Sequence, residues 1–179
     1  GSFLTGGLAG GNVVGTITNS YSTTKVTGSN SGNSTGGLVG FDYFGTYSRC
    51  YSKGTVTGGT YVGGLIGYAY YDWLTDCYFD GSVTGSKDFI GGLLGSGTLS
   101  TIKKCYSKGT VTGSNDYTGG LIGLNYYGNV KNSYSKSAVK GVYSTGGLIG
   151  CNYLSQVSSC YADGPVTIAS SDCVAGGLV

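Results

Sequence analysis

A Gly-Gly-Leu tripeptide recurs along the whole chain at nearly constant spacing. It begins at seven positions: Gly6, Gly36, Gly63, Gly91, Gly119, Gly146 and Gly176. Successive copies lie 30, 27, 28, 28, 27 and 30 residues apart. A repeat of this length is typically one supersecondary unit that cannot bury its apolar face alone and therefore stacks on its neighbours. The spacing restricts the 179-residue chain to a repeat architecture.

The pattern within each unit predicts strands. Apolar residues come in short β-branched or aromatic runs separated by Gly, Asn, Ser and Asp, and no segment has the 3.6-residue period of an amphipathic helix. About three short strands fit one unit, which matches a coil of a β-solenoid, whereas a propeller blade usually needs about 40 residues. We therefore predict an all-β fold: a parallel β-solenoid, as a right-handed β-helix of about six coils spaced by about 4.8 Å, in one domain over 1–179.

Composition excludes several functional classes. The chain has no His, which excludes imidazole-based metal sites and base catalysis. Net charge is only +2, and Lys and Arg are scattered, whereas a nucleic-acid or anionic-membrane surface needs them clustered. No apolar run approaches the roughly 18 residues of a membrane span. We expect no cofactor, no nucleic-acid partner and no membrane span.

A Cys-Tyr or Ser-Tyr pair follows each of the first six Gly-Gly-Leu copies and gives two columns when the coils stack in register. The two-residue side-chain period of a strand turns the Cys or Ser inward and the Tyr outward. The inward cysteines are Cys50, Cys77, Cys105 and Cys160. We interpret them as buried thiols that pack as small hydrophobes; a disulfide between neighbouring rungs stays open, and zinc is not expected without a CxxC pair. Cys151 and Cys173 lie outside this column.

The outward tyrosines form a ladder that is a candidate binding or assembly surface. Its members are Tyr21, Tyr51, Tyr78, Tyr106, Tyr134 and Tyr161. Exposed amphipathic rings in a row suit sugar rings or a partner protein. The alternative is that the rings stack on one another and stabilise the sheet.

Charged residues beside the ladder are predicted to alternate in sign from rung to rung. The two expected columns are Arg49, Asp76 and Lys104, and Lys53, Asp80 and Lys108. Opposite charges facing across strands stabilise a sheet by about 0.2–1 kcal/mol. Because each acid already has cations on both adjacent rungs, we favour this structural charge ladder over the acid pair of a glycosidase or lyase, and we predict no catalytic residue.

A second apolar column follows the leucines, for example Val39 and Ile66. Neighbouring residues on a strand face opposite sides, so we expect one of the two columns to leave the core and to need a cover. The aromatic loops downstream are one candidate cover, and another copy of the protein is the other. Five residues of these loops join the candidate binding or assembly surface: Tyr70, Tyr71, Trp73, Tyr126 and Tyr127.

The GGLVG, GGLIG and GGLLG cores at Gly36, Gly63, Gly91, Gly119 and Gly146 resemble the GLUG repeat, with a weaker copy at 6–10. The resemblance covers nearly the whole chain. The GLUG family occurs in secreted and surface bacterial proteins, including adhesin-like arrays and non-catalytic regions of IgA-cleaving peptidases. The resemblance implies an extracellular or cell-surface repeat module, and it brings no catalytic residue because the motif has none.

The chain starts just before one Gly-Gly-Leu and stops inside another, and neither end shows a recognisable cap. We expect the domain either to be part of a longer array or to pair with other copies, end to end or laterally, because open parallel edges favour such pairing. We therefore expect a non-enzymatic extracellular structural protein that forms a fibre or an adhesin stalk. The alternative is a binding module whose Tyr ladder and aromatic loops engage carbohydrate. A polysaccharide-processing β-helix, or an ice-binding solenoid using the Thr rows at 55–57 and 110–112, comes third.

Overall fold

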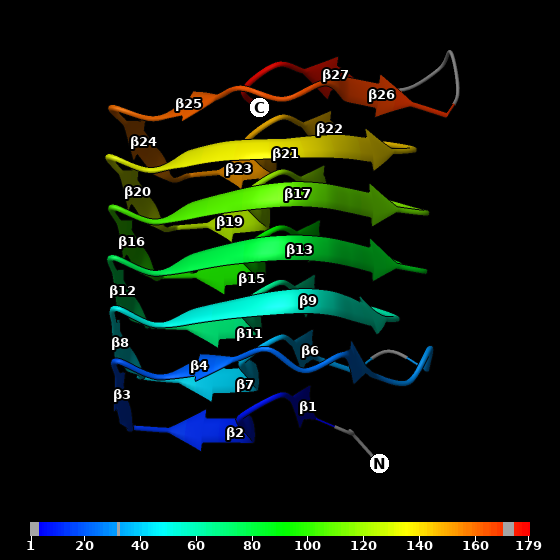
Figure 1. Ribbon diagram of the computed structural model, residues 1–179. Helices are drawn as coiled ribbons and strands as arrows, with labels where there is room; N and C mark the ends of the chain where they lie inside the picture. Colours follow the sequence, from blue (N-terminus) through cyan, green and yellow to red (C-terminus); the bar gives the residue numbers. More distant parts are fainter. Residues whose placement is uncertain (1–3, 32, 170–173) are drawn as a thin grey trace.

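The structure of this chain, a computed structural model, describes residues 4–31, 33–169 and 174–179. The chain winds into a stack of coils in which every pair of neighbouring strands is parallel, so the predicted parallel β-solenoid is confirmed (Figure 1). Within the described ranges no helix is long and apolar enough to cross a membrane.

Each of the four middle coils contributes one strand to each of four sheets, one strand more than the sequence led us to expect, and the first and sixth coils contribute two short strands each to sheet D. Sheet A contains β1 (Thr5–Gly6), β6 (Thr35–Gly36), β10 (Val62–Gly63), β14 (Ile90–Gly91), β18 (Thr118–Gly119), β22 (Thr145–Gly146) and β27 (Ala175–Gly176). Sheet B contains β2 (Ala9–Val13), β7 (Val39–Tyr43), β11 (Ile66–Tyr70), β15 (Leu94–Thr98), β19 (Ile122–Tyr126) and β23 (Ile149–Tyr153).

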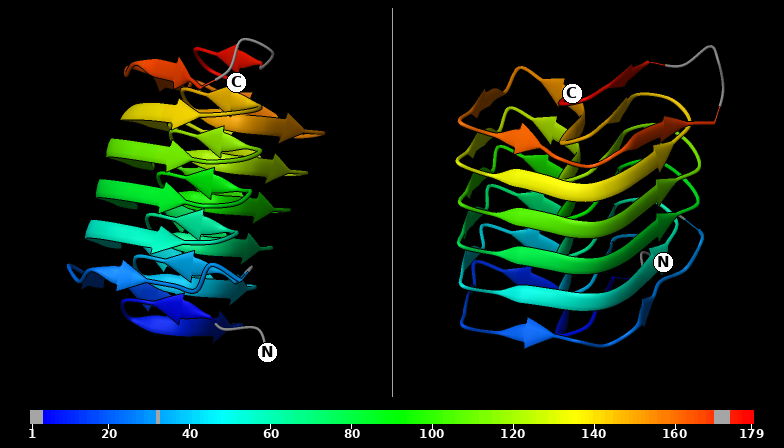
Figure 2. Two further views of the ribbon diagram at one scale, coloured as in Figure 1. Left: turned by 90° about the vertical axis from the view of Figure 1, so that its right-hand side faces the viewer. Right: turned by 45° about the horizontal axis from the view of Figure 1, so that its top comes forward.

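The other two sheets complete the coil. Sheet C contains β3 (Thr16–Thr18), β8 (Thr46–Ser48), β12 (Trp73–Thr75), β16 (Thr101–Lys103), β20 (Asn129–Lys131) and β24 (Gln156–Ser158). Sheet D contains β4 (Tyr21–Ser22), β5 (Val26–Thr27), β9 (Tyr51–Gly58), β13 (Tyr78–Gly85), β17 (Tyr106–Gly113), β21 (Tyr134–Gly141), β25 (Tyr161–Ala162) and β26 (Val166–Ile168). Sheets D and B form opposite faces of the stack, and sheet C forms the edge that joins them (Figures 1 and 2).

Register between coils is constant although the length of the four inner repeats varies by one residue, from 27 to 28. The variation falls in the connection from sheet D to sheet A, which has three residues at 59–61 and four at 86–89. From sheet A onward equivalent residues pair directly, so that Tyr78 is opposite Tyr51 on one side and Tyr106 on the other. The connection therefore absorbs the length difference, and the columns of equivalent side chains stay aligned.

The corner between sheets A and B corrects one expectation. We expected one of the two apolar columns to leave the core, but Leu93 and Leu94 are both fully buried, and so are the equivalent pairs in the neighbouring coils. Leu93 lies in the bend between β14 and β15, where the strand alternation does not apply. The N–H groups of both leucines donate to the carbonyl oxygen of Leu121, at 2.7 and 3.0 Å, so both side chains turn inward and no external cover is needed.

Glycine is required at this bend because backbone atoms of its own coil and of the next coil both approach it closely. A Cβ atom at Gly91 would lie 1.9 Å from the carbonyl oxygen of Leu94 and 2.7 Å from the backbone nitrogen of Gly123. Real Cβ atoms do not approach backbone atoms so closely, and the backbone cannot move aside without breaking rung-to-rung hydrogen bonds.

We predict that Gly91→Ala destabilises the fold by roughly 1–3 kcal/mol or more, since it overpacks a site walled by backbone. Gly97→Ala in the same coil is the matched control. A Cβ there would meet only side-chain atoms, the nearest at 3.3 Å, and the equivalent residue of the preceding coil is Ala69. Urea denaturation of both variants checks this, and equal stability of the two would contradict the account of the bend.

Candidate functional site

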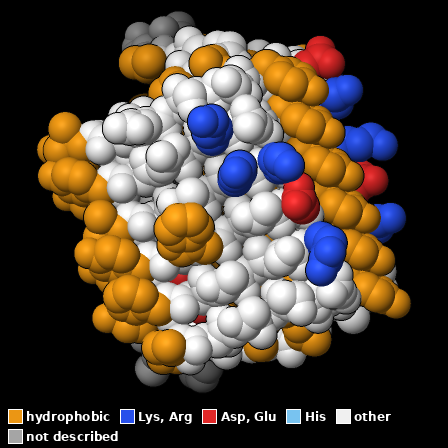
Figure 3. All heavy atoms as spheres, turned by 90° about the vertical axis from the view of Figure 1, so that its left-hand side faces the viewer, with side chains coloured by type: hydrophobic (Ala, Val, Ile, Leu, Met, Phe, Trp, Pro, Cys, Tyr) orange, Lys and Arg blue, Asp and Glu red, His pale blue; other side chains and the backbone are white. Residues whose placement is uncertain are grey.

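The outer surface carries two separate aromatic faces, one on sheet D and one on sheet B. Figure 3 views the molecule from the sheet C edge and shows hydrophobic side chains along both sides with charged side chains between them. The candidate surface residues are therefore not one site. The Tyr ladder lies on sheet D, Tyr70 and Tyr126 lie on sheet B, Tyr71 and Tyr127 follow at the corner between sheets B and C, and Trp73 begins a strand of sheet C.

The tyrosines of sheet D form one continuous stack. Successive ring centroids are 4.8–5.0 Å apart and the ring planes differ by at most 7°. Each ring of the four middle coils is half-buried because its two faces contact the rings above and below. A ligand therefore reaches the edges and hydroxyl groups of these rings, whereas their apolar faces are already used in stabilising the sheet.

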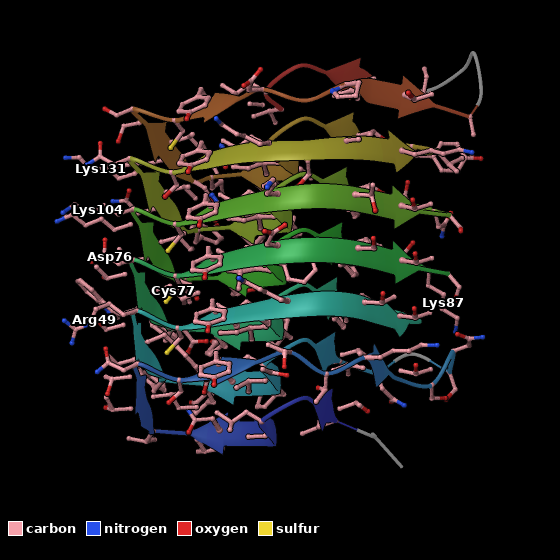
Figure 4. All side chains as sticks on the ribbon, in the orientation of Figure 1. Arg49, Asp76, Cys77, Lys87, Lys104 and Lys131 are labelled. Carbon is pink, nitrogen blue, oxygen red and sulfur yellow. The ribbon has the colours of Figure 1, made fainter. Side chains whose placement is uncertain are left out.

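Charged side chains beside the ladder point into solvent. Arg49, Asp76 and Lys104 occupy the corner between sheets C and D, all with left-handed backbone (φ 53–54°), and project from that edge in Figure 4. Among the described residues the one ion pair within 4.0 Å joins Lys108 Nζ to Asp80 Oδ2, at 3.9 Å. Lys53 instead places Nζ 5.4 Å from the ring centre of Tyr51. The expected columns exist, but most of their charges are solvated individually.

The cysteine column lies inside the solenoid. Cys50, Cys77 and Cys105 are fully buried free thiols, and Cys160 in the last complete coil is partly exposed. Hydrogen bonding with Cys105, together with burial, raises the pKa of the Cys77 thiol to about 12, so the thiol is protonated and unreactive at neutral pH. Cys151 is also free, and Cys173 lies outside the described residues.

The aromatic loops expected beside the Gly-Gly-Leu motifs are in fact the outer side of sheet B and its corner with sheet C. Tyr43 stacks on Tyr70 with 5.4 Å between ring centroids, and Phe44 stacks on Tyr71 at 4.8 Å. Phe44 and Tyr71 have left-handed backbone, as do their equivalents Leu99, Tyr127 and Leu154. A non-glycine residue in this conformation costs roughly 1–2 kcal/mol, so the stacked corner is maintained by packing between coils.

One outward column of sheet B holds tyrosine at four coils and is interrupted between the second and third of them. The strand β15 carries Ser96 and Thr98 where the preceding coil carries Tyr68 and Tyr70. The interruption leaves a hollow of about 410 Å³ whose lining includes all four of these residues.

Two buried carboxyl groups were not predicted from the sequence. Asp42 on β7 and Asp72, which follows β11, lie on adjacent coils and are both fully buried. Asp42 Oδ1 accepts hydrogen bonds from Asn12 Nδ2 at 3.1 Å and from its neighbouring backbone N–H at 2.8 Å, and Asp72 Oδ1 accepts from the Gly45 N–H at 2.8 Å. The Oδ2 atoms of both acids have no N–H or O–H donor among the described residues. A proton on one carboxyl group would let it donate to the other, and a hydrogen bond between the two acids is among the causes of both pKa shifts.

Burial raises the pKa of both acids, and the negative charge of Asp42 helps to raise the pKa of Asp72 to about 8. Two such acids are typical of a catalytic dyad, but these are sealed inside the solenoid, where no substrate reaches them. No cluster of three or more metal-ligating side chains was found in the part of the chain that the structure describes. The pair is therefore a structural element whose protonation is linked to folding.

We predict that Asp72→Asn flattens the pH dependence of stability. The pKa of about 8 in the folded chain exceeds the ordinary Asp value of 3.8, so the folded chain keeps a proton that the unfolded chain releases between these values. Stability of the wild type therefore falls as pH rises from 4 to 8, by at most about 1.4 kcal/mol per pH unit for one proton. Asn donates its amide N–H to Asp42 without titrating.

Urea midpoints measured across this range, with exposed Asp163→Asn as control, test the linkage. The control should follow the wild-type profile. An Asp72→Asn profile as steep as that of the wild type would show that the pair does not hold the proton.

Comparison with known proteins agrees with the fold and the repeat. The GLUG motif matches residues 58–84, 114–140 and 141–169. A crystal structure described as that of a "putative immunoglobulin A1 protease from Bacteroides ovatus" shares the fold with a TM-score of 0.71 and 19% identity. The similarity covers 97% of this chain and 65% of that chain, so this chain spans about two thirds of its neighbour. No curated protein matches significantly. The resemblance to the GLUG repeat is confirmed: three repeats of this chain are GLUG motifs, carried on a parallel β-solenoid.

Proposed function

We propose that this chain is a non-enzymatic structural module of an extracellular or cell-surface protein, which builds a stalk or a fibre by continued stacking of coils. The observation that carries this proposal is the parallel, in-register stacking of equivalent coils, in which each coil covers the apolar side chains of its neighbour. Leu8 is 51% exposed, whereas its equivalent Leu38 in the next coil is fully buried. The leucine that is fully buried in an inner coil is thus about half exposed in the first coil.

Both ends of the stack have unpaired strand edges. At one end β2 and β3 have a neighbouring strand on one side only, and at the other end β23 and β24 are in the same position. Leu8 and Val13 are exposed at the first end, and Leu178 is exposed at the second. A further coil of the same pattern would pair these edges and cover this apolar surface. Such a head-to-tail contact propagates along one axis unless rotation closes it.

The placement of the acids supports a non-enzymatic role. The two carboxyl groups with raised pKa values, Asp42 and Asp72, are fully buried, and the exposed Asp80 is paired with Lys108. The activity in the neighbour's description is a competing hypothesis, because 19% identity concerns the fold alone. The remaining alternative, a binding module for carbohydrate or a partner protein, is favoured by the exposed aromatic side chains outside the Tyr ladder.

We expect the purified chain to form rods longer than one solenoid at high concentration, visible by negative-stain electron microscopy and by sedimentation velocity. Leu8→Asp should shorten or abolish them, because it places a charge in the apolar contact between ends. Tyr143→Asp, a change at an exposed aromatic side chain between β21 and β22 that belongs to no candidate surface, is the matched control and should leave them intact. Monomers at every concentration would contradict self-assembly, and turnover of a protein or polysaccharide substrate that Asp76→Asn abolishes would contradict the non-enzymatic role.

A further inference from the structure

One outward column of sheet B, from the second coil to the sixth, is a row of tyrosines with one rung missing. Tyr43 and Tyr70 stack at 5.4 Å on one side of the gap, and Tyr126 and Tyr153 stack at 5.2 Å on the other. The residue in register between Tyr70 and Tyr126 is Thr98. The ladder on sheet D has no such gap, since every coil from the first to the sixth contributes a tyrosine there.

The gap has room for one ring. Tyr70 and Tyr126 are two rungs apart, roughly 9.6 Å at the usual strand spacing of about 4.8 Å. A ring placed midway would lie roughly 4.8 Å from each tyrosine, which is the separation that the stacked rings of sheet D adopt. The hollow of about 410 Å³ is within the usual size range of small-molecule sites, and aromatic walls with few polar groups are typical of them.

The base of the hollow carries hydroxyl groups. Ser96 lines it, is 1% exposed, and its Oγ has no hydrogen-bond partner among the described residues. Thr98 adds a second hydroxyl at the gap itself. Buried hydroxyl groups are nearly always hydrogen-bonded, so an unpaired one beside a hollow indicates a group that arrives with a ligand.

The chemistry of the lining selects the ligand. No charged side chain lines the hollow, so the ligand is neutral. Two tyrosine faces require a ring with two apolar faces, and Ser96 and Thr98 require hydroxyl groups at its edge. A pyranose ring has both properties, whereas a phenyl ring of a peptide has no group to pair with Ser96.

We propose that the missing rung is a binding site for a neutral pyranose of a glycan, held between Tyr70 and Tyr126 with its hydroxyl groups on Ser96 and Thr98. A second hollow of about 240 Å³ adjoins it, shares Leu124 and Tyr126, and is also lined by Tyr117, Cys151 and Tyr153. A chain of sugars would occupy both. The site goes beyond the proposed structural role, and it lies on the side of the stack, away from the coil ends, so either proposal can fail alone.

Titration calorimetry with neutral hexasaccharides (cellohexaose, laminarihexaose, mannohexaose and maltohexaose) tests the proposal. We expect the wild type to bind at least one of them. Thr98→Tyr supplies the missing ring, which the neighbouring coils accommodate at the same position, and should abolish binding while preserving or raising the melting temperature. Thr84→Tyr, at an exposed position of β13, is the matched control and should bind like the wild type.

Ser96→Ala, which keeps the rings in place, should weaken binding by about tenfold and provides a second test that does not enlarge any side chain. Binding of no hexasaccharide by the wild type would overturn the proposal, as would full binding by Thr98→Tyr or by Ser96→Ala. Binding of a neutral Phe-rich peptide in place of every sugar would also overturn it, because it would assign the gap to a protein partner.

Discussion

Rung-to-rung hydrogen bonding between equivalent residues is the interaction on which the rest of this structure depends. Backbone N–H groups of one coil donate to the carbonyl oxygens of an adjacent coil, as in Leu65 to Leu93 at 2.8 Å and Leu93 to Leu121 at 2.7 Å. Because the sheets are parallel and in register, each side chain has its own equivalents as nearest neighbours. A side chain that packs well against its own kind is therefore stabilised by its equivalents on the adjacent coils. A side chain that repels its own kind would be destabilised by the same arrangement.

This constraint explains which side chains occupy the columns. Tyr rings, thiols and small hydroxyl residues gain from contact with their own kind, and they form the long columns. Carboxyl groups do not gain from contact with other carboxyl groups, since two ionised acids on adjacent buried rungs would repel each other. Asp42 and Asp72 occur once each in their columns, and they are accommodated by a proton. Stacking also constrains the backbone. Glycine is needed at the bend of each Gly-Gly-Leu because it allows adjacent coils to approach within hydrogen-bonding distance.

The parts of the fold that follow strand alternation could be predicted from the sequence. Cys77 and Tyr78 face inward and outward as expected, because the alternation that holds along β13 extends to the residue before it. Leu93 and Leu94 could not be placed in this way, because a bend between two strands breaks the alternation, and a two-residue strand such as β14 leaves no sequence pattern.

The buried acid pair and the gap at Thr98 could not be predicted for a different reason. Both occur where the sequence departs from the repeat. Asp42 stands in a column that holds Asn at three other coils (Asn12, Asn125 and Asn152), and this mismatch was the available signal for the buried acid pair. Thr98 likewise stands in a column of tyrosines, but its meaning depends on knowing that β11, β15 and β19 are adjacent strands. Positions that deviate from the repeat are thus the positions at which to look for a property other than stacking.

The central claim, that each rung is stabilised by its immediate neighbours, is tested most directly by a double-mutant cycle on the Tyr ladder. Alanine substitutions at Tyr78 and Tyr106, which stack at 4.8 Å, should show a coupling free energy of about 0.5–1.5 kcal/mol in urea denaturation. The same cycle on Tyr51 and Tyr134, which are three rungs apart, should show additivity. No coupling between Tyr78 and Tyr106, or equal coupling in both cycles, would contradict the account.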